Sequence, residues 1–243
     1  KVSALLFLVF SIPCFVFVKE NGSSKYLGSR LKALRGSVNQ LIKTLGRTRM
    51  YPGLSQGAMN TILMHGDDKQ KECFMPPMVE GRWAGTMCLT EPQCGTDLGQ
   101  VKTRAELNSD GSYKITGTKI FISSGEHDMT ENIIHIVLAR LPGAPAGTNG
   151  ISLFIVPKVN VSAQGELLER NSVYCDSIEK KMGIHGSSTC VLNFEEANGF
   201  LIGEENKGLH CMFTFMNTAR IGTSIQGIGS CELAYQGSVP YAK

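Results

Sequence analysis

The sequence predicts an α+β fold in which a small antiparallel β-barrel or β-sandwich lies between helical segments. Apolar, β-branched runs of strand length fill the stretch from about residue 83 to residue 194. Turns rich in glycine, proline and asparagine separate these runs, and no helix long enough for a parallel crossover lies between them. Hydrophobic residues make up 42% and charged residues 19% of the 243 residues, which is typical of a chain with a buried core.

Two helices are predicted before the strands. A Tyr-Pro-Gly turn at 51–53 precedes a short helix over 58–64, where apolar residues recur at helical spacing. Gly66 is expected to end this helix in a left-handed conformation, and one of the two aspartates after it should cap the next helix. That second helix is predicted over 69–79, and the Pro76-Pro77 pair should keep it short.

Five strands are predicted in the middle of the chain. They cover residues 86–90, 113–122, 133–139, 151–156 and 190–194. Asp110-Gly111 is a hairpin-turn signal directly before the second of these strands.

A last helix is predicted from 208 to 219 and on toward the end of the chain, with apolar residues at i, i+3, i+4 and i+7. Three glycines in its second half each cost about 1 kcal/mol relative to alanine, so we expect them to allow close packing against a neighbour. They are Gly222, Gly227 and Gly229. Pro240 should kink or end the helix. The chain stops soon after with an apolar face still to be covered, so we expect a fragment.

The N-terminal segment 1–49 is left unassigned. Residues 2–18 form an uncharged apolar run, slightly short for a membrane span, which needs about 20 residues. A misassembled end, a targeting segment and a membrane contact are the alternatives. Residues 25–49 carry seven Lys or Arg and no acid, which fits a basic arm or a solvated helix face.

Charge and cysteine content exclude several classes of protein. The net charge of +3 is too small to argue for a nucleic-acid partner. The eight cysteines form no C-x-x-C pair, and no histidine lies at zinc-ligand spacing, so no metal site is predicted. Scattered cysteines indicate free thiols in a reducing compartment.

Two stretches could bind a ligand. In residues 87–97, a strand ends at Thr90, and Gly95 allows a sharp turn whose backbone N–H groups could form an anion site beside Thr96. In residues 117–125, a second strand brings Phe121 and a serine to its end, and an aromatic face beside a hydroxyl suits a flat heteroaromatic ring.

A third stretch, 180–189, is a basic turn that leads into a strand. His185 within it could act as an acid or a base, but no serine or cysteine nucleophile pattern accompanies it. A structural or solvent-exposed role is the favoured interpretation.

Taken together, these stretches resemble the acyl-CoA dehydrogenase family. The motifs TEP-x-x-G-[ST]-D at 90–97, K-x-x-I-[ST] at 119–123, K-x-G-x-x-x-S-x-T at 181–189 and Asn-Thr-Ala-Arg at 217–220 occur in the family's order. The resemblance covers residues 50–243. The MYPGL opening and the long loop 125–150 look most like the large branch that includes 3-methylmercaptopropionyl-CoA dehydrogenase.

The resemblance implies an N-terminal helical domain ending at 50–82, a flavin-binding β-barrel at 83–203 and the first helix of a C-terminal bundle at 204–243. It also implies FAD as the cofactor, with the hydride chemistry supplied by the flavin. The positions that match cofactor contacts are Met87, Leu89, Thr90, Gly95, Thr96, Phe121, Ile122 and Ser123. The positions that match contacts to the CoA part of a substrate are Thr96, Asn217 and Arg220.

Three departures from the family pattern accompany the resemblance. Phe121 stands where many members have tryptophan, and Cys94 and Thr96 replace the commoner alanine and serine. No catalytic residue can be assigned, because the family's general base is a glutamate that would lie beyond Lys243. Glu91 does not replace it, since it matches a structural position of the motif.

The function expected of the full-length protein is α,β-dehydrogenation of an acyl-CoA, with electrons passed to an electron-transfer flavoprotein. A homodimer or tetramer in the mitochondrial matrix or the cytoplasm is expected, and this chain alone should be inactive. The alternatives are a catalytically dead barrel that binds flavin or acyl-CoA or is only structural, and an acyl-CoA oxidase that passes electrons to oxygen.

Overall fold

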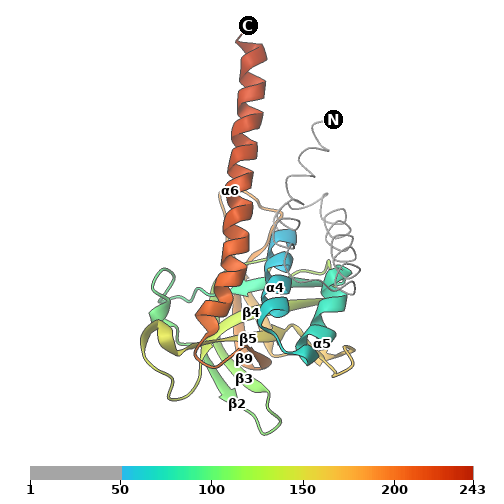
Figure 1. Cartoon of the computed structure of the whole chain (residues 1–243), viewed down its shortest axis with the longest axis vertical. Coiled ribbons are helices and arrows are strands. Elements are labelled where there is room, and N and C mark those ends of the chain that lie inside the picture. The colour runs from blue at the N-terminus through green and yellow to red at the C-terminus, as the bar shows by residue number, and fades with distance from the viewer. Residues whose placement is uncertain (1–50, 243) are drawn as a thin grey trace.

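The computed structural model describes residues 51–242. Helices α4 (Tyr51–His65) and α5 (Asp68–Val79) come first, a β-barrel follows, and helix α6 (Gly208–Tyr241) ends the chain. Figure 1 shows the barrel at the base of the molecule, with α4 and α5 against it and α6 rising far beyond it. The predicted arrangement of a barrel flanked by helices is therefore confirmed. The N-terminal segment 1–49, with its apolar and basic runs, lies outside the described residues.

Helix α4 is longer than the sequence predicts. It is already helical at Tyr51, so the prediction of a turn at 51–53 was wrong. Proline is tolerated in the first turn of a helix, because no intrahelical partner is needed for its missing N–H group there. The prediction of a left-handed Gly66 was also wrong, since Gly66 is not among the positive-φ glycines and its N–H donates to the Ile62 carbonyl at 2.8 Å.

Helix α5 keeps both of its prolines inside. Asp67 caps it, because its carboxylate accepts from the Gln70 N–H at 2.7 Å and the Gln70 side chain accepts from the Asp67 N–H in return. The helix continues through Pro76 and Pro77 to Val79, so the expected shortening does not occur. The buried residues of this helix are Phe74, Pro77, Met78 and Val79. Their packing offsets the helical hydrogen bonds that are lost because proline has no backbone N–H donor.

Nine strands form the sheets in the described part of the chain. They are β1 (Trp83–Cys88), β2 (Arg104–Leu107), β3 (Tyr113–Ser123), β4 (Asn132–Arg140), β5 (Ile151–Pro157), β6 (Val159–Val161), β7 (Leu167–Arg170), β8 (Val173–Ile178) and β9 (Thr189–Ile202). Two short 3₁₀ turns, η1 (Leu98–Gln100) and η2 (Gly147–Gly150), lie in the loops. The predicted hairpin turn before β3 is confirmed, because β2 and β3 pair antiparallel across Gly111, whose φ is 85°.

The strand pairing closes into a barrel. β4 pairs with β5, β5 with β9, β9 with β3, β3 with β2, and β2 returns to β4. β8 extends the sheet beside β9, and β6 and β7 pair separately. β1 pairs with β4 in parallel, which departs from the expected antiparallel pattern. The β2–β3 hairpin makes this parallel connection, so no crossover helix is needed.

Three further expectations about the strands need correction. The predicted strand at 86–90 begins and ends earlier, as β1. The region 125–150, which the family resemblance treats as one long loop, is divided by β4, the strand predicted at 133–139. The strand predicted at 190–194 continues as β9 to Ile202, since it spans two neighbours of the barrel.

Helix α6 runs unbroken past Pro240 to Tyr241, so the expected kink does not occur, although the helix ends one residue later. Within the described residues, the expectation that the α6 glycines pack closely is not met. A methyl group placed on Gly222, Gly227 or Gly229 would meet no atom within 4 Å. No helix among residues 51–242 is long and apolar enough to cross a membrane.

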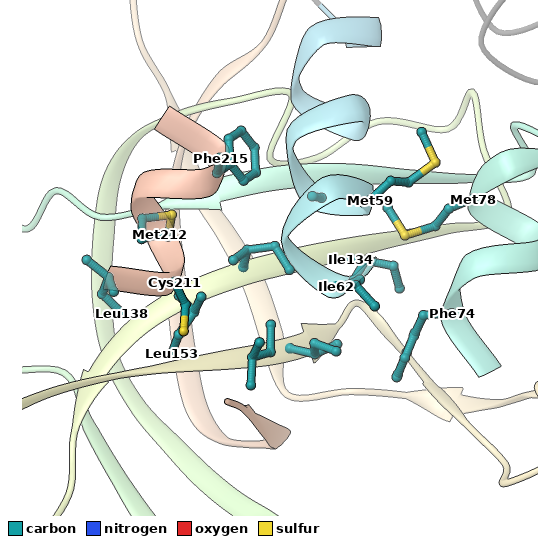
Figure 2. Packing of buried hydrophobic residues seen from close by; sticks show 14 of the residues in the cluster. Met59, Ile62, Phe74, Met78, Ile134, Leu138, Leu153, Cys211, Met212 and Phe215 are labelled. Atoms are coloured by element: carbon teal, nitrogen blue, oxygen red, sulfur yellow. The ribbon is translucent and has the colours of Figure 1, made fainter. Parts of the chain in front are cut away.

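Two apolar clusters form the core. One fills the barrel interior around Ile115, Phe154 and Phe194. The other joins the barrel to the three helices, and Figure 2 shows Met59 and Ile62 of α4 facing Ile134 of β4. α6 contributes to this second cluster through its N-terminal residues 209–216, among which Cys211, Met212 and Phe215 are buried. All three helices therefore pack against the barrel through this second cluster.

Candidate functional site

The predicted anion-binding turn is a tight loop that follows β1. Glu91 and Cys94 exchange both backbone hydrogen bonds, at 2.8 and 3.0 Å, so the chain reverses over Pro92 and Gln93. Leu89 and Thr90 are half-buried just before the reversal, and Gly95 and Thr96 are exposed just after it. The turn therefore presents the backbone and hydroxyl that the sequence predicts. Its exposed backbone can approach a ligand closely.

The second predicted stretch contains a β-bulge. The register of β3 against β9 shifts between Lys119 and Ile122, and Phe121 adopts a left-handed φ of 59°. The bulge turns Phe121 out of the sheet, and 58% of the side chain is exposed. Ile122 instead points into the barrel interior and is 2% exposed, while Ser123 is half-buried. Of the three predicted contacts, Phe121 presents the largest open face.

Hydrogen bonds join these two stretches. The Ile120 N–H donates to the Thr90 carbonyl at 2.9 Å, and the Lys119 ammonium donates to the Leu89 carbonyl at 3.0 Å. The end of β1 is therefore tied to the residues directly before Phe121. Residues separated by about 30 positions in the sequence form one continuous edge of the barrel.

A buried ion pair lies beneath this edge. Lys119 Nζ donates to Glu91 Oε1 at 2.8 Å, and the two side chains are 0% and 3% exposed. The Glu91 carboxylate also accepts from the Thr103 hydroxyl at 2.6 Å, from the N–H groups of Thr103 and Lys102 at 3.0 and 2.7 Å, and from the Gln93 amide. Both oxygens of this carboxylate therefore accept hydrogen bonds from groups of the protein.

The charges of this pair follow from its surroundings. Burial opposes the charge on Glu91, but Lys119 beside it and the hydrogen bonds from Thr103 and Lys102 lower the pKa of the carboxyl to about 2. Burial lowers the pKa of Lys119, and Glu91 opposes that shift. Glu91 therefore stays ionised, and it cannot collect a proton near neutral pH. The expectation that it is no general base agrees with its structural setting.

Met87 faces helix α6 across an open pocket of about 440 Å³, and the other predicted flavin contacts do not line it. Met87 of β1 lies on one side, and Met216 and Arg220 of α6 lie on the other. Ala219, Thr223 and Ser224 complete the lining. The structure thus brings together two predicted site residues, Met87 and Arg220, from segments more than a hundred residues apart. The pocket has apolar walls, with a guanidinium and two hydroxyls on the helix side.

The predicted CoA-contacting residues are neighbours on α6. Arg220 donates to the Asn217 side chain at 3.2 Å, and its guanidinium carbon lies 5.5 Å from the centre of the Phe213 ring. Both Asn217 and Arg220 are exposed. The guanidinium is held by a neutral amide and an aromatic face, and no carboxylate within hydrogen-bonding distance in the described residues neutralises it. It is free to bind a phosphate in the bidentate manner that arginine favours.

The third predicted stretch lies apart from this pocket's lining. Lys181 Nζ donates to the carbonyls of Ile184 and Ser187, at 2.9 and 2.6 Å, and this closes the 180–189 turn. His185 is exposed on the same turn. The structure gives Lys181 a structural contact, in line with the favoured interpretation of this stretch.

Several residues of the site were not singled out from the sequence. Lys119 is the most informative, because it occupies a position of β3 where the alternation of side chains predicts an inward direction. A lysine at an inward position needs a buried carboxylate, and this signal could have led to Glu91. Met216, Thr223 and Ser224 lie on the predicted last helix, but only the three-dimensional arrangement shows that they face Met87.

Comparisons with known proteins agree with this architecture. Residues 86–197 match the family model described as acyl-CoA dehydrogenase, middle domain. The 3-methylmercaptopropionyl-CoA dehydrogenase of Ruegeria pomeroyi is 47% identical over 194 residues, which cover 80% of this chain and 33% of that protein. A butyryl-CoA dehydrogenase of Syntrophomonas wolfei is 42% identical over 203 residues and covers 80% of this chain and 33% of the relative.

A solved structure shows the same arrangement of barrel and helices. Butyryl-CoA dehydrogenase from Megasphaera elsdenii superposes with a TM-score of 0.64 at 32% identity, over 88% of this chain and 51% of that chain. The barrel with its flanking helices is therefore an α+β domain of the dehydrogenase type. The chain carries the middle domain of the acyl-CoA dehydrogenase family, as its motifs predicted. It spans about a third of the length of the two curated relatives.

Proposed function

We propose that this chain is the flavin-binding part of an FAD-dependent acyl-CoA dehydrogenase. The observation that carries the proposal is the joined barrel edge, where Thr90 and Phe121 lie on hydrogen-bonded segments. Next to it, Met87 faces Arg220 across an open pocket. A bound flavin would accept a hydride from the β-carbon of an acyl-CoA.

The groups at this edge fit the chemical parts of FAD. The exposed aromatic face of Phe121 and the thioether of Met87 suit a flat, weakly polar ring. Thr90 and Ser123 add hydroxyls that can donate to ring heteroatoms. The exposed backbone at Gly95 and the hydroxyl of Thr96 suit phosphate oxygens. Each kind of group that a dinucleotide needs is therefore present.

The acyl-CoA is proposed to meet the protein on the α6 side. Arg220 and Asn217 are exposed there, and a guanidinium fork matches the phosphates of a CoA nucleotide. The Glu91 carboxylate is engaged by its ion pair and its hydrogen bonds. We therefore propose that the general base of the full-length enzyme lies outside the described residues. Electrons are proposed to pass from the reduced protein to an electron-transfer flavoprotein.

Flavin binding tests the proposal directly. We would record visible absorption spectra of this chain, and of a longer protein that contains it, during titration with FAD. Retention of a flavin that bleaches on addition of butyryl-CoA is expected in at least the longer protein. If neither protein retains flavin, the proposed function is wrong.

A pair of variants locates the flavin on the barrel edge. Phe121→Asn keeps a residue that tolerates the left-handed conformation but removes the aromatic face, so FAD should bind about tenfold more weakly. Leu107→Asn is the control, because Leu107 is also exposed, at 66%, but lies on β2 in the hairpin with β3. Equal FAD dissociation constants for the two variants would remove Phe121 from the site.

A further inference from the structure

The ion pair of Glu91 and Lys119 is unusual for its burial. Lys119 is among the largest fully buried side chains of the described residues, and Glu91 is 3% exposed. Every other ion pair in this part of the chain has at least one partner whose side chain is 28% exposed or more. Charged side chains are almost never this deeply buried unless they are paired, and the apolar interior does not itself require them.

Stability alone does not account for the pair. A buried ion pair loses so much hydration that well-packed apolar residues often stabilise a fold equally well. Apolar residues could not, however, make the hydrogen bonds that this pair makes. Lys119 binds the Leu89 carbonyl, and Glu91 binds Thr103 and the Lys102 N–H. The pair therefore connects three separate backbone segments.

Two of these segments carry predicted flavin contacts. The Leu89 carbonyl and Glu91 belong to the stretch that presents Thr90, and Lys119 lies two residues before the bulge that exposes Phe121. Bulges interrupt the regular ladder, so the sheet by itself fixes the position of such a residue poorly. The Lys119 ammonium adds a second link between the bulge and the end of β1, next to the hydrogen bond from the Ile120 N–H to the Thr90 carbonyl.

We propose that Glu91 and Lys119 are positioning residues, which hold the end of β1 and the β3 bulge at the spacing that a flavin ring requires. This inference rests on the proposed function. Neither residue needs to touch the cofactor. The pair acts through the Leu89 carbonyl and through the turn that Glu91 closes with Cys94.

The test uses a neutral replacement of the pair, Glu91→Gln with Lys119→Met, in the form of the protein that retains FAD. Glutamine can still accept from Thr103, and methionine fills the volume of the lysine stem, so the barrel should fold. The Leu89 carbonyl loses its partner. FAD affinity should fall by about tenfold to 100-fold, and the visible circular dichroism of the remaining bound flavin should change.

The matched control is a second ion pair, whose lysine also lies on β3 and whose glutamate lies on β9. Lys114 Nζ lies 2.6 Å from Glu196 Oε2, but the two side chains are 46% and 69% exposed. The double variant Lys114→Met with Glu196→Gln removes one charge of each sign from the surface of β3 and β9. Its FAD affinity and flavin spectrum should equal those of the unmodified protein.

Amide exchange of the flavin-free protein provides a second readout. The Ile120 N–H is bonded to the Thr90 carbonyl, so its exchange should become faster in the buried-pair variant and stay unchanged in the control. If the buried-pair variant folds and binds FAD with unchanged affinity and spectrum, the positioning role is wrong and the proposed function stands. If the unmodified protein binds no FAD, both are wrong. If the double variant fails to fold, Lys119→Met alone decides in the same way, because the Leu89 carbonyl loses its partner while Glu91 keeps its hydrogen bonds from Thr103 and the Lys102 N–H.

Discussion

Phe121 combines a left-handed backbone with an exposed aromatic side chain. Its left-handed backbone costs an L-residue about 1–2 kcal/mol, and 58% of its side chain is exposed, so little burial offsets that cost. Strained residues of this kind persist where the surroundings enforce them, and they cluster at functional sites. The β3 bulge and the ion pair beneath it supply that enforcement here. The strain is therefore consistent with a binding role for the aromatic face.

His135 is a second residue whose surroundings determine its behaviour. It is fully buried in the barrel, its Nδ1 lies 2.7 Å from the Thr86 hydroxyl, and its Nε2 has no hydrogen-bond partner in the described part of the chain. Burial, with smaller contributions from the charges of Lys158 and His127, lowers the pKa of His135 from 6.5 to about 3. The imidazole is therefore neutral in the folded protein.

The neutral histidine makes stability depend on pH. Below pH 6.5 the unfolded chain binds a proton that the folded chain does not bind, so this stability is complete above pH 6.5 and is lost as the pH falls toward about 3. The slope contributed by His135 is at most about 1.4 kcal/mol per pH unit. In urea unfolding between pH 7 and pH 4, His135→Gln should show a shallower decline than the unmodified chain.

His185→Gln is the control, because that ring is exposed on the 180–189 turn. Burial also lowers the pKa of His127, to about 4, so part of the decline should remain in the His135 variant. An unchanged slope after His135→Gln would show that His135 is accessible to protons in the folded state.

At the scale of elements, the contact of α4 with α6 depends on one glycine. A methyl group added to Gly57 would lie 2.3 Å from two ring carbons of Phe215, a side chain with no exposed surface. The ring cannot move away without disturbing the core around Met212. Gly57→Ala should therefore lower the free energy of unfolding by about 1–3 kcal/mol.

Gly53→Ala is the matched change on the same helix. A methyl group there meets no atom within 4 Å, and alanine favours a helix by about 0.5–1 kcal/mol over glycine. This variant should be as stable as the unmodified chain or more stable in thermal unfolding. Equal stability losses at positions 53 and 57 would contradict the close contact of Phe215 with Gly57.

Comparison of elements shows which signals in the sequence were sufficient. β3, β4 and β5 were predicted to within one or two residues, because their apolar or alternating patterns are set by burial in the barrel. The range predicted for α5 was right to within one residue, but the expected shortening at its prolines does not occur, since local proline rules do not include the packing that holds the helix against the barrel. β7 has no buried residue, so no hydrophobic pattern marks it in the sequence.

The candidate site also contains residues that the sequence indicated and contacts that only the structure shows. The family motifs indicated Met87, Thr90, Phe121 and Arg220 because each lies in a short contiguous stretch. The buried ion pair could not be assigned from a motif, since it joins Glu91 to a lysine on another strand. The inward direction of Ile122 follows from the bulge, which reverses the alternation expected for an unbroken strand.

At the scale of the whole molecule, the closed barrel anchors one end of a long helix. α6 is buried at Cys211, Met212 and Phe215, but beyond the pocket its side chains are largely exposed, including Ile228 at 70% and Tyr235 at 68%. Figure 1 shows this second half standing clear of the barrel. A helix normally buries one apolar face, so these exposed residues form a surface that the described part of the chain leaves uncovered.

This arrangement predicts unequal stability along α6. Most of the stability of a helix in a protein comes from packing of one of its faces, and each glycine of the second half lowers helix stability by about 1 kcal/mol. In hydrogen exchange of this chain, amides of residues 211–216 should be protected by the core, whereas amides of residues 228–239 should open with a free energy near zero. Equal protection along the helix would contradict this and show that the second half is covered in solution. Loss of that protection on dilution would identify a second copy of the chain as the cover, because only an intermolecular contact depends on concentration.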